Sequence, residues 1–329
     1  MRLDVRIAVL CIILIVVLCW SLMVGAVPLR VEIVLNTLFE LDGPRQNFII
    51  MQSRLPRSLL AALTGGALAL SGAIVQTILC NDLASPKIIG INSGAALGVI
   101  TANLLLPTLP SNYLSLAAAG GAALAAGLVF LLFELRAVSP TRLILIGVAL
   151  GLFFEAIVNF LLIILPNTSV SGPLIWLSGS LWGLGWSNLT MIWLPLTVLF
   201  AVTGLLSYRL DLLRLGRAQA VSLGVHVRRE RLALLTLATL LAALSVSAVG
   251  VMGFVGLMAP HLARALVGWR HQLLLPTAAL TGAILVTFAD TVGRIIAPPI
   301  EVSAGILTAV IGAPFFIVIL LRNRREVQP

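Results

Sequence analysis

Residues 58–80 form an apolar run without a charged side chain. At about 1.5 Å per residue, a helix of this length spans a hydrocarbon core of roughly 30 Å. Pro56 fits the first helical turn, where its missing N–H would have no partner. Small residues, including Gly65, Gly66 and Gly72, recur at three- and four-residue steps. Because such residues let helix backbones approach closely in lipid, the run is predicted to be a packed membrane-spanning helix.

Similar apolar runs continue along the chain. Hydrophobic residues make up 60% of the 329 residues and charged residues only 10%, compared with roughly 25% charged in soluble domains. The sequence predicts an all-α polytopic membrane protein, with a single transmembrane domain over residues 1–329 and about ten helices, several of them short or broken. The expected spans are 7–27, 58–80, 88–106, 114–133, 143–165, 190–207, 232–251, 255–268, 273–296 and 304–321.

Ten spans place both termini on one side, and the basic residues indicate which side this is. With both termini in the cytoplasm, 16 of the 21 basic residues lie in cytoplasmic loops and 5 lie outside. The bias of Lys and Arg toward cytoplasmic loops supports this orientation and explains the net charge of +9 without a nucleic-acid partner. The first run is too long for a signal peptide and is expected to remain as a span.

Three of the outer arginines, Arg54, Arg57 and Arg294, lie at helix ends on the side where cations are disfavoured. One interpretation is local: Arg294 follows Asp290 at the spacing of an intrahelical ion pair, and arginines also extend to lipid headgroups. The other is a basic rim that docks an acidic soluble partner through arginine–carboxylate contacts. Both interpretations are open on the residues alone.

Two connecting segments are predicted to form short helices. The cytoplasmic loop 209–231 mixes apolar residues with arginines and is interrupted by Gly216 and Gly224, which fits two short helices on the inner surface. This pattern is typical of a basic segment on anionic lipid or of a docking element for a cytoplasmic subunit. The division into two compact short helices favours the docking element. Residues 166–188 are rich in Gly and Trp, which predicts an interfacial helix outside.

Irregular or polar positions inside the spans indicate a pathway. Gly253, Gly256 and Pro260 disfavour a continuous helix, and broken backbone is tolerated in a membrane only where protein or a water-filled cavity covers it. Glu155 lies in the middle of a span, where a charge is costly, so it is expected to face a cavity or a partner. A proton relay in a secondary transporter is the alternative role for Glu155.

No catalytic motif is present in the sequence. The chain lacks a G-x-x-x-x-G-K-[ST] loop and Lys87 is its only lysine, so any ATP used in transport must be bound by another chain. The three histidines lack metal-ligand spacing, and the three cysteines indicate neither a disulfide framework nor a metal site. We therefore expect a transport subunit that is not an enzyme and binds no metal or other cofactor.

Several motifs resemble one family of transport proteins. R-L-P-R, G-G-A-L-A-L-S-G, N-D-L-A-S-P and G-I-N-S-G-A-A-L-G occur between residues 54 and 98, and G-F-V-G-L-M-A-P-H-L-A-R, A-D-T-V-G-R and G-A-P-F-F follow later. Through them nearly the whole chain resembles the permease subunits of binding-protein-dependent ABC importers for iron chelates and vitamin B12. The stretches I-W-L-S-G-S-L-W-G-L-G-W-S and R-I-I-A-P-P-I-E look most like the ferric citrate permeases.

The resemblance implies a type II ABC importer permease in the bacterial inner membrane, paired with a second permease subunit that is identical or related. Two cytoplasmic ATPase subunits would bind ATP and Mg, and a periplasmic or lipid-anchored binding protein would deliver the cargo. The implied cargo is an iron(III) chelate, either ferric citrate or a siderophore. Vitamin B12 or haem carried by the same machinery is the alternative.

The resemblance also assigns roles to residues. Arg54, Arg57 and Arg294 match family arginines that meet glutamates of the binding protein. Ser139, Pro140 and Thr141 match a loop that narrows the path on the cytoplasmic side, while Glu155, Gly253 and Gly256 stay the pathway candidates. The residues expected at the ATPase are Ala220, Ser222, Leu223, Gly224, Val225 and Arg228.

Two positions depart from the family pattern. Asp82 and Ser303 stand where the family commonly has proline, in N-P-L-A and E-L-P-x-G respectively. Each missing proline is expected to loosen a helix start, the second one beside the outer docking surface. The fold is expected to be unaffected, and any effect should fall on coupling or on the fit of the binding protein.

Overall fold

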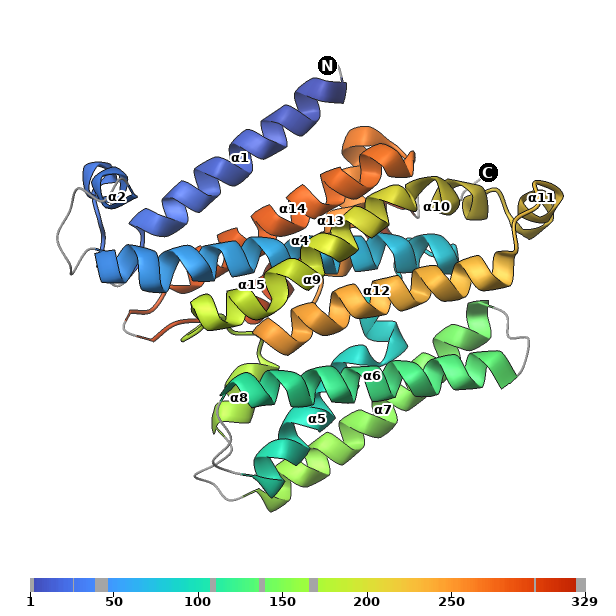
Figure 1. The fold of residues 1–329 in the computed structure, drawn as a ribbon, viewed down its shortest axis with the longest axis horizontal. Coiled ribbons are helices and arrows are strands. Elements are labelled where there is room, and N and C mark those ends of the chain that lie inside the picture. Colours follow the sequence, from blue (N-terminus) through green and yellow to red (C-terminus); the bar gives the residue numbers. More distant parts are fainter. Residues whose placement is uncertain are drawn as a thin grey trace.

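The computed structural model describes residues 3–25, 27–38, 47–106, 111–135, 140–165, 171–298 and 300–323, and it is built from helices (Figure 1). Among these residues, seven helices are long and apolar enough to cross a membrane, and three shorter apolar helices accompany them. The predicted all-α polytopic fold is confirmed. The helices that match the ten predicted spans, in order, are α1 (Leu3–Met23), α4 (Leu55–Leu79), α5 (Ile91–Leu105), α6 (Ser111–Leu135), α7 (Pro140–Ile164), α9 (Trp186–Leu205), α12 (Val227–Val249), α13 (Val255–Val267), α14 (His271–Gly293) and α15 (Ala304–Asn323).

Short elements connect these helices. They are α2 (Val31–Leu38), η1 (Phe48–Arg54), η2 (Pro86–Ile89), α8 (Ser171–Leu177), α10 (Ser207–Arg214) and α11 (Arg217–Ser222). α8 confirms the helix predicted within 166–188, and α10 and α11 confirm the two predicted within 209–231. Gly216 and Gly224 border α11 with φ values of 96° and 79°, a backbone region that favours glycine. The sequence pattern did not indicate α2.

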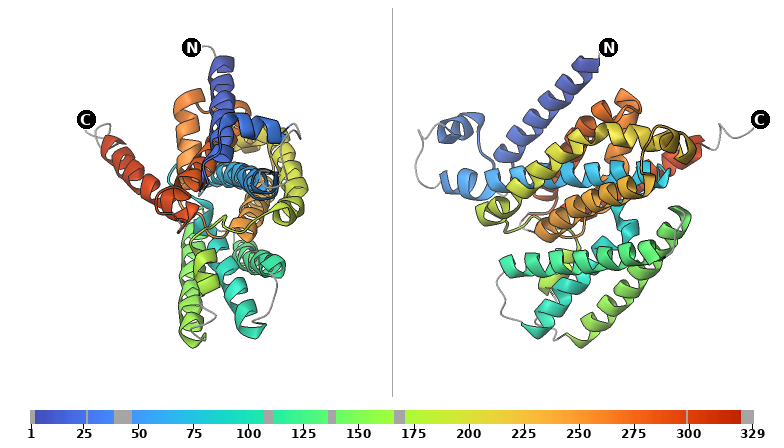
Figure 2. Two further views of the ribbon diagram at one scale, coloured as in Figure 1. Left: turned by 90° about the vertical axis from the view of Figure 1, so that its left-hand side faces the viewer. Right: turned by 45° about the vertical axis from the view of Figure 1, so that its right-hand side comes forward.

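α4 runs through the centre of the molecule, where α14, α12, α13 and α9 pack around it (Figure 1). α5, α6 and α7 form a second layer, which contacts the first mainly through α12. α10 and α11 lie at one end of the molecule, whereas α2 and α8 lie at the other. The beginning of α1 and the end of α15 both point toward the α10–α11 end (Figure 2), as an even number of spans requires.

Glycines allow the neighbours of α4 to approach its backbone closely. A Cβ atom added at Gly72 would lie 1.8 Å from the carbonyl oxygen of Gly256 in α13. One added at Gly65 would lie 2.3 Å from the carbonyl oxygen of Gly282 in α14. The close packing that small residues predicted for the 58–80 run is therefore confirmed.

We expect Gly72→Ala to destabilise the protein by about 1–3 kcal/mol or more, because α4 and α13 must move apart to admit the methyl group. Gly120→Ala on α6 is the matched control, since a Cβ atom at Gly120 would meet no atom within 4 Å. Thermal unfolding of both variants in detergent measures the difference. Equal unfolding temperatures for the two variants would contradict the close contact.

The predicted break after the seventh span is confirmed. α12 ends at Val249 because Gly250 has a φ of 79°, and a new helix, α13, begins only at Val255. Phe254, the residue before α13, also has a positive φ of 64°, which is uncommon for a residue with a side chain. Gly312 of α15 leaves room for it, since a Cβ atom there would lie 2.4 Å from the Phe254 Cβ.

Candidate docking and coupling sites

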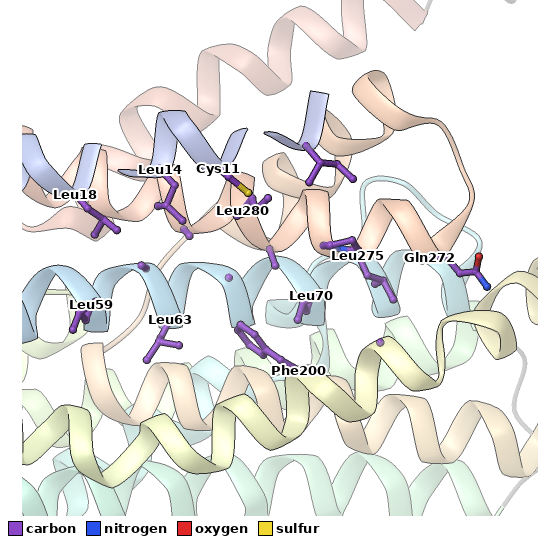
Figure 3. A pocket seen from close by; sticks show the side chains of 17 residues that line it. Cys11, Leu14, Leu18, Leu59, Leu63, Leu70, Phe200, Gln272, Leu275 and Leu280 are labelled. Carbon is purple, nitrogen blue, oxygen red and sulfur yellow. The ribbon is translucent and has the colours of Figure 1, made fainter. Parts of the chain in front are cut away.

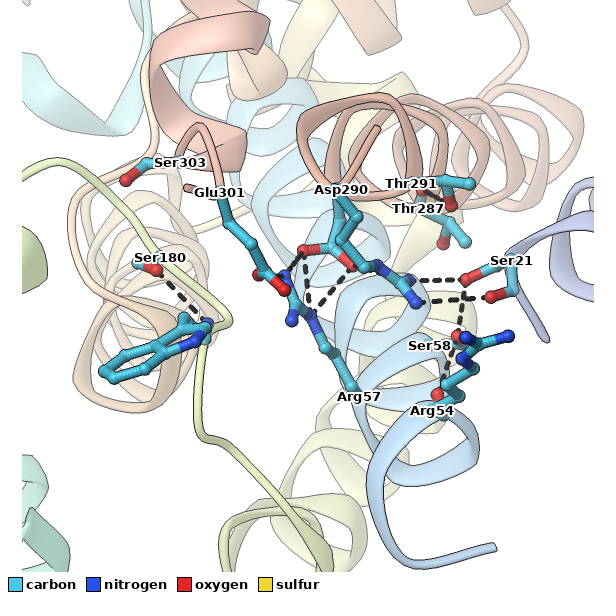
Figure 4. Close-up of polar contacts among 12 residues, drawn as sticks. Ser21, Arg54, Arg57, Ser58, Ser180, Thr287, Asp290, Thr291, Glu301 and Ser303 are labelled. Atoms are coloured by element: carbon cyan, nitrogen blue, oxygen red, sulfur yellow. Dashed lines mark hydrogen bonds and ion pairs between the residues drawn. The ribbon is translucent and has the colours of Figure 1, made fainter. Parts of the chain in front are cut away.

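A cluster of buried charges joins α4 to the end of α14 near the α2 end of the molecule (Figure 4). Its centre is Asp290, whose side chain is 2% exposed. Arg57 Nη2 lies 2.7 Å from Asp290 Oδ1, and Arg294 Nη2 lies 2.7 Å from Asp290 Oδ2. Glu301, with a side chain 27% exposed, forms an ion pair with Arg57 at 2.8 Å. Two carboxylates thus neutralise two guanidinium groups.

α1 is bound to the same cluster. Arg294 donates hydrogen bonds to the hydroxyl and the carbonyl oxygen of Ser21, at 2.7 and 3.2 Å. Arg54 donates to the carbonyl oxygens of Leu22 and Val27, which lie at and beyond the end of α1. Because these contacts satisfy the exposed carbonyl groups at the end of α1, the arginines hold α1 against α4 and α14.

The prediction of an exposed basic rim is wrong for this structure. Arg54, Arg57 and Arg294 are 6%, 9% and 5% exposed, and each has acceptors within the chain. A guanidinium group is buried only when it is paired, and the carboxylates and helix-end carbonyls supply those pairs. The local interpretation of Arg294 with Asp290 is confirmed. Sequence reasoning missed that Arg57 shares Asp290 across 233 residues.

The segment predicted to contact an ATPase forms α11 and the turn after it, at the opposite end of the molecule (Figure 1). Ala220 is buried and Val225 is half-buried, so these two residues hold the segment in place. Leu223 is 60% exposed, an apolar side chain on a segment rich in arginine. The other exposed residues of the predicted set are Ser222, Gly224 and Arg228.

α10 connects this segment to the helix bundle. Asp211 Oδ1 lies 2.6 Å from His271 Nδ1 at the start of α14, and His271 Nε2 lies 2.8 Å from the hydroxyl of Thr77 in α4. Arg209 forms an ion pair with Glu230 of α12 at 2.6 Å. Hydrogen bonding to Glu230 raises the pKa of Arg209 above its ordinary value, so Arg209 stays charged. These contacts connect α10 to α14, α4 and α12.

A second connection passes through Trp269, between α13 and α14. The guanidinium carbon of Arg214, at the end of α10, lies 3.7 Å from the centre of the Trp269 ring, and that of Arg264 lies 5.0 Å from it. Arg264 also forms an ion pair with Asp82 at 2.8 Å. Asp82, which stands at a family proline position, therefore connects the end of α4 to α13.

Ser303, the second departure from the family pattern, also has a partner. Its hydroxyl oxygen lies 2.6 Å from that of Ser178, the residue after α8. Ser303 directly precedes α15, and its carbonyl oxygen accepts hydrogen bonds from the first turn of that helix. The contact with Ser178 therefore connects the start of α15 to the end of α8.

The pathway candidates lie in three different environments. Glu155 is exposed on α7, and its side chain has no ion-pair or hydrogen-bond partner among the described residues. Gly253 is half-buried in the break between α12 and α13, with free space where a Cβ atom would point. Gly256 is buried instead: a Cβ atom there would lie 2.9 Å from the carbonyl oxygen of Leu68. Gly256 is therefore a packing residue within this chain, and its place beside a pathway stays a prediction.

The predicted cytoplasmic gate lies largely outside the described part of the chain. Ser139 falls outside the described residues, and so do the side chains of Pro140 and Thr141. α7 begins at Pro140. For metal binding, no group of three or more His, Cys, Asp or Glu residues is close enough to hold an ion among the described residues.

Comparison with known proteins gives matches over almost the full chain. Residues 13–322 match the FecCD transport family. The chain is 42% identical over 320 residues to the Fe(3+)-citrate import system permease protein YfmE of Bacillus subtilis (strain 168), covering 97% of this chain and 96% of that protein. It is 43% identical over 284 residues to the Fe(3+) dicitrate transport system permease protein FecD of Escherichia coli (strain K12), covering 86% and 88%. A metal-chelate type ABC transporter solved in an inward-facing conformation matches with a TM-score of 0.86 and 34% identity, over 97% of this chain and 99% of that one.

Proposed function

The chain belongs to the FecCD transport family, and on this premise we propose that the iron chelate it carries is ferric citrate. It is a multi-pass permease of the iron-chelate ABC importer type. Identities of 42% and 43% to two Fe(3+)-citrate permeases support the choice of cargo. Another siderophore, or vitamin B12 or haem, is the second candidate cargo.

As an ABC importer permease, the chain works in a complex with other subunits. We infer that two ATPase subunits, which bind ATP and Mg, contact α11 and the turn after it. Three apolar side chains in and beside α11, Leu215, Val221 and Leu223, are 50%, 56% and 60% exposed. They support this assignment, since a concentration of exposed apolar side chains marks a protein-binding surface more than a single one does. In this scheme the α10–α11 end and both termini lie in the cytoplasm of a bacterium, and the opposite end receives the substrate-binding protein.

The exposed face of α7 supports pairing with a second permease subunit. Glu155 shares this face with Leu152 and Phe160, which are 63% and 61% exposed. A carboxylate facing lipid in the middle of a membrane costs about 2.5–3.5 kcal/mol on insertion scales. A second subunit packed across α7, with the substrate path between the two, would remove Glu155 from lipid. Gly253 remains a candidate for the wall of that path.

The contacts suggest how the subunits act together. A loaded binding protein docks at the α2–α8 end, and ATP binding closes the ATPase subunits against α11. α10 passes that movement to α4, α12 and α14 through the contacts of Asp211, Arg209 and Arg214. Arg54, Arg57 and Arg294 hold the outer helix ends together in this scheme, and they are not assigned to direct docking.

Uptake of radioactive ferric citrate tests the proposal in cells that express the chain with its ATPase and binding-protein partners. We expect the labelled compound to accumulate in these cells. Accumulation should stop when the partner ATPase is inactivated, and an excess of unlabelled ferric citrate should reduce it. No accumulation of ferric citrate, together with ATPase-dependent uptake of labelled vitamin B12 or haem by the same cells, would assign another cargo. Accumulation that persists with an inactive ATPase and collapses with a proton uncoupler would identify a secondary transporter.

A further inference from the structure

An apolar groove lies between α1 and the body of the molecule (Figure 3). Its volume is about 760 Å³, and its walls come from α1, α4, α9 and α14. Of the lining side chains, only those of Cys11 and Gln272 carry a heteroatom. Small residues, including Ala62 and Gly204, deepen the groove, and a Cβ atom at Gly204 would meet no atom within 4 Å. The groove is therefore open and suited to an apolar ligand.

The length of the groove matches one leaflet of a bilayer. It is lined by residues 7–18 of α1, 59–70 of α4 and 272–283 of α14. Each stretch rises by about 17 Å at 1.5 Å per residue, which is roughly half of a 30 Å hydrocarbon core. On α14 the lining residues belong to the half of the helix that begins at the α10–α11 end. An extended acyl chain of the leaflet at that end would fit this length.

Two cations lie close in sequence to lining residues at the α10–α11 end of the groove. Arg6 directly precedes the lining residue Ile7, and its guanidinium donates to the carbonyl oxygen of Leu266. This contact uses one of its five N–H donors. Arg270 is exposed and precedes the lining residue Gln272 by two positions. Its side chain has no ion-pair or hydrogen-bond partner among the described residues.

We propose that the groove binds one anionic phospholipid of the inner leaflet, with an acyl chain between α1 and the α4–α14 pair and the phosphate near Arg6 and Arg270. Guanidinium groups match phosphate oxygens in geometry and charge, and the groove wall matches a hydrocarbon chain. A polar iron chelate does not suit this site, since the wall offers almost no hydrogen-bond partner. The lipid would bridge α1 to the bundle. Only its assignment to the inner leaflet rests on the proposed orientation.

Photo-crosslinking in vesicles tests this site with the transporter that contains the full chain. The probe is phosphatidylglycerol with a photoreactive acyl chain, at low mole fraction in phosphatidylcholine. We expect crosslinks on peptides that contain residues 7–18 and 272–283, and competition by unlabelled phosphatidylglycerol. Gly204→Trp, which fills the groove, should lower this labelling at least fivefold, whereas Gly127→Trp on α6 should not, because a Cβ atom at Gly127 also meets open space.

The arginines are tested by a separate variant. Arg6→Gln with Arg270→Gln should weaken competition by phosphatidylglycerol by roughly fivefold for each arginine removed. This variant leaves the apolar wall intact, so it decides the proposal even if Gly204→Trp fails to fold. Equal labelling in Gly204→Trp and wild type, or labelling spread evenly over α6 as well, would overturn the site. An identical response to phosphatidylcholine, with no effect of the arginine variant, would overturn the choice of an anionic lipid.

Discussion

Replacing Asp290 with asparagine should lower the thermal unfolding temperature of this permease by roughly 10 °C. The Asp290 side chain is 2% exposed and pairs with both Arg57 and Arg294. Asparagine keeps the size but removes the charge, which leaves Glu301 to neutralise two buried guanidinium groups. Breaking a buried ion pair by removing one partner costs about 3–5 kcal/mol, and each kcal/mol corresponds to roughly 2–4 °C in larger domains. Unfolding of the purified protein in detergent measures this shift.

Asp82→Asn is the matched control for that prediction. Asp82 also forms an ion pair with an arginine, at 2.8 Å, but its side chain is 46% exposed. The Arg264 side chain is 8% exposed. Because solvent reaches the pair through Asp82 and Arg264 keeps its hydrogen bond to Gln76, the fall in unfolding temperature should be clearly smaller than that for Asp290→Asn. Losses of equal size in the two variants would show that burial does not distinguish Asp290, and the central role assigned to it would be wrong.

The burial of the outer arginines changes what a charge-reversal experiment measures. If Arg54 and Arg57 formed an exposed rim, replacing both by glutamate would abolish docking and leave the permease in the membrane. In this structure the new carboxylates would lie beside Asp290 and the carbonyl oxygens of Leu22 and Val27. Unpaired buried carboxylates of this kind would destabilise the permease so strongly that little folded protein would remain. Uptake lost in that variant would therefore report on stability and not on docking.

Much of the fold could be predicted because the signals are local. Each span is an apolar run of sufficient length, so the number and order of the ten helices follow from the sequence. The two short helices of the 209–231 loop follow from Gly216 and Gly224, whose backbone angles end helices. α2 was missed because its eight residues, between two apolar runs, are too few for a clear helical period.

The candidate sites could be predicted only in part, because contacts between distant helices leave no local pattern. Nothing near Arg57 indicates that its partner is Asp290, on a helix that begins more than 200 residues later. Gly256 was predicted beside the path because glycine often marks a break in a helix. In the structure its backbone packs directly against Gly72 of α4, a contact that the local sequence does not reveal. The partners of Asp82 and Ser303 likewise appear only once α13 and α8 are placed.

Replacing Leu223 with aspartate should abolish ATP-driven uptake while leaving the permease folded. Leu223 follows α11 and is 60% exposed, so in the proposed complex its side chain is buried by an ATPase subunit. A residue at the centre of such an interface contributes about 2 kcal/mol or more, which is roughly a 30-fold change in affinity. Surface substitutions usually change stability by less than about 0.5 kcal/mol, so the unfolding temperature should stay close to that of the wild type. Co-purification of the ATPase subunit measures the loss.

Leu174→Asp separates this effect from that of any exposed aspartate. Leu174 is 50% exposed on α8, at the opposite end of the molecule (Figure 1). The Leu174→Asp permease should therefore retain its ATPase, although it changes the same residue type at similar exposure. An ATPase that stays bound to the Leu223→Asp permease at wild-type affinity would contradict a contact at α11. The contacts of α10 with α4, α12 and α14 would then only stabilise the fold, because no ATPase subunit would bind α11 and displace α10.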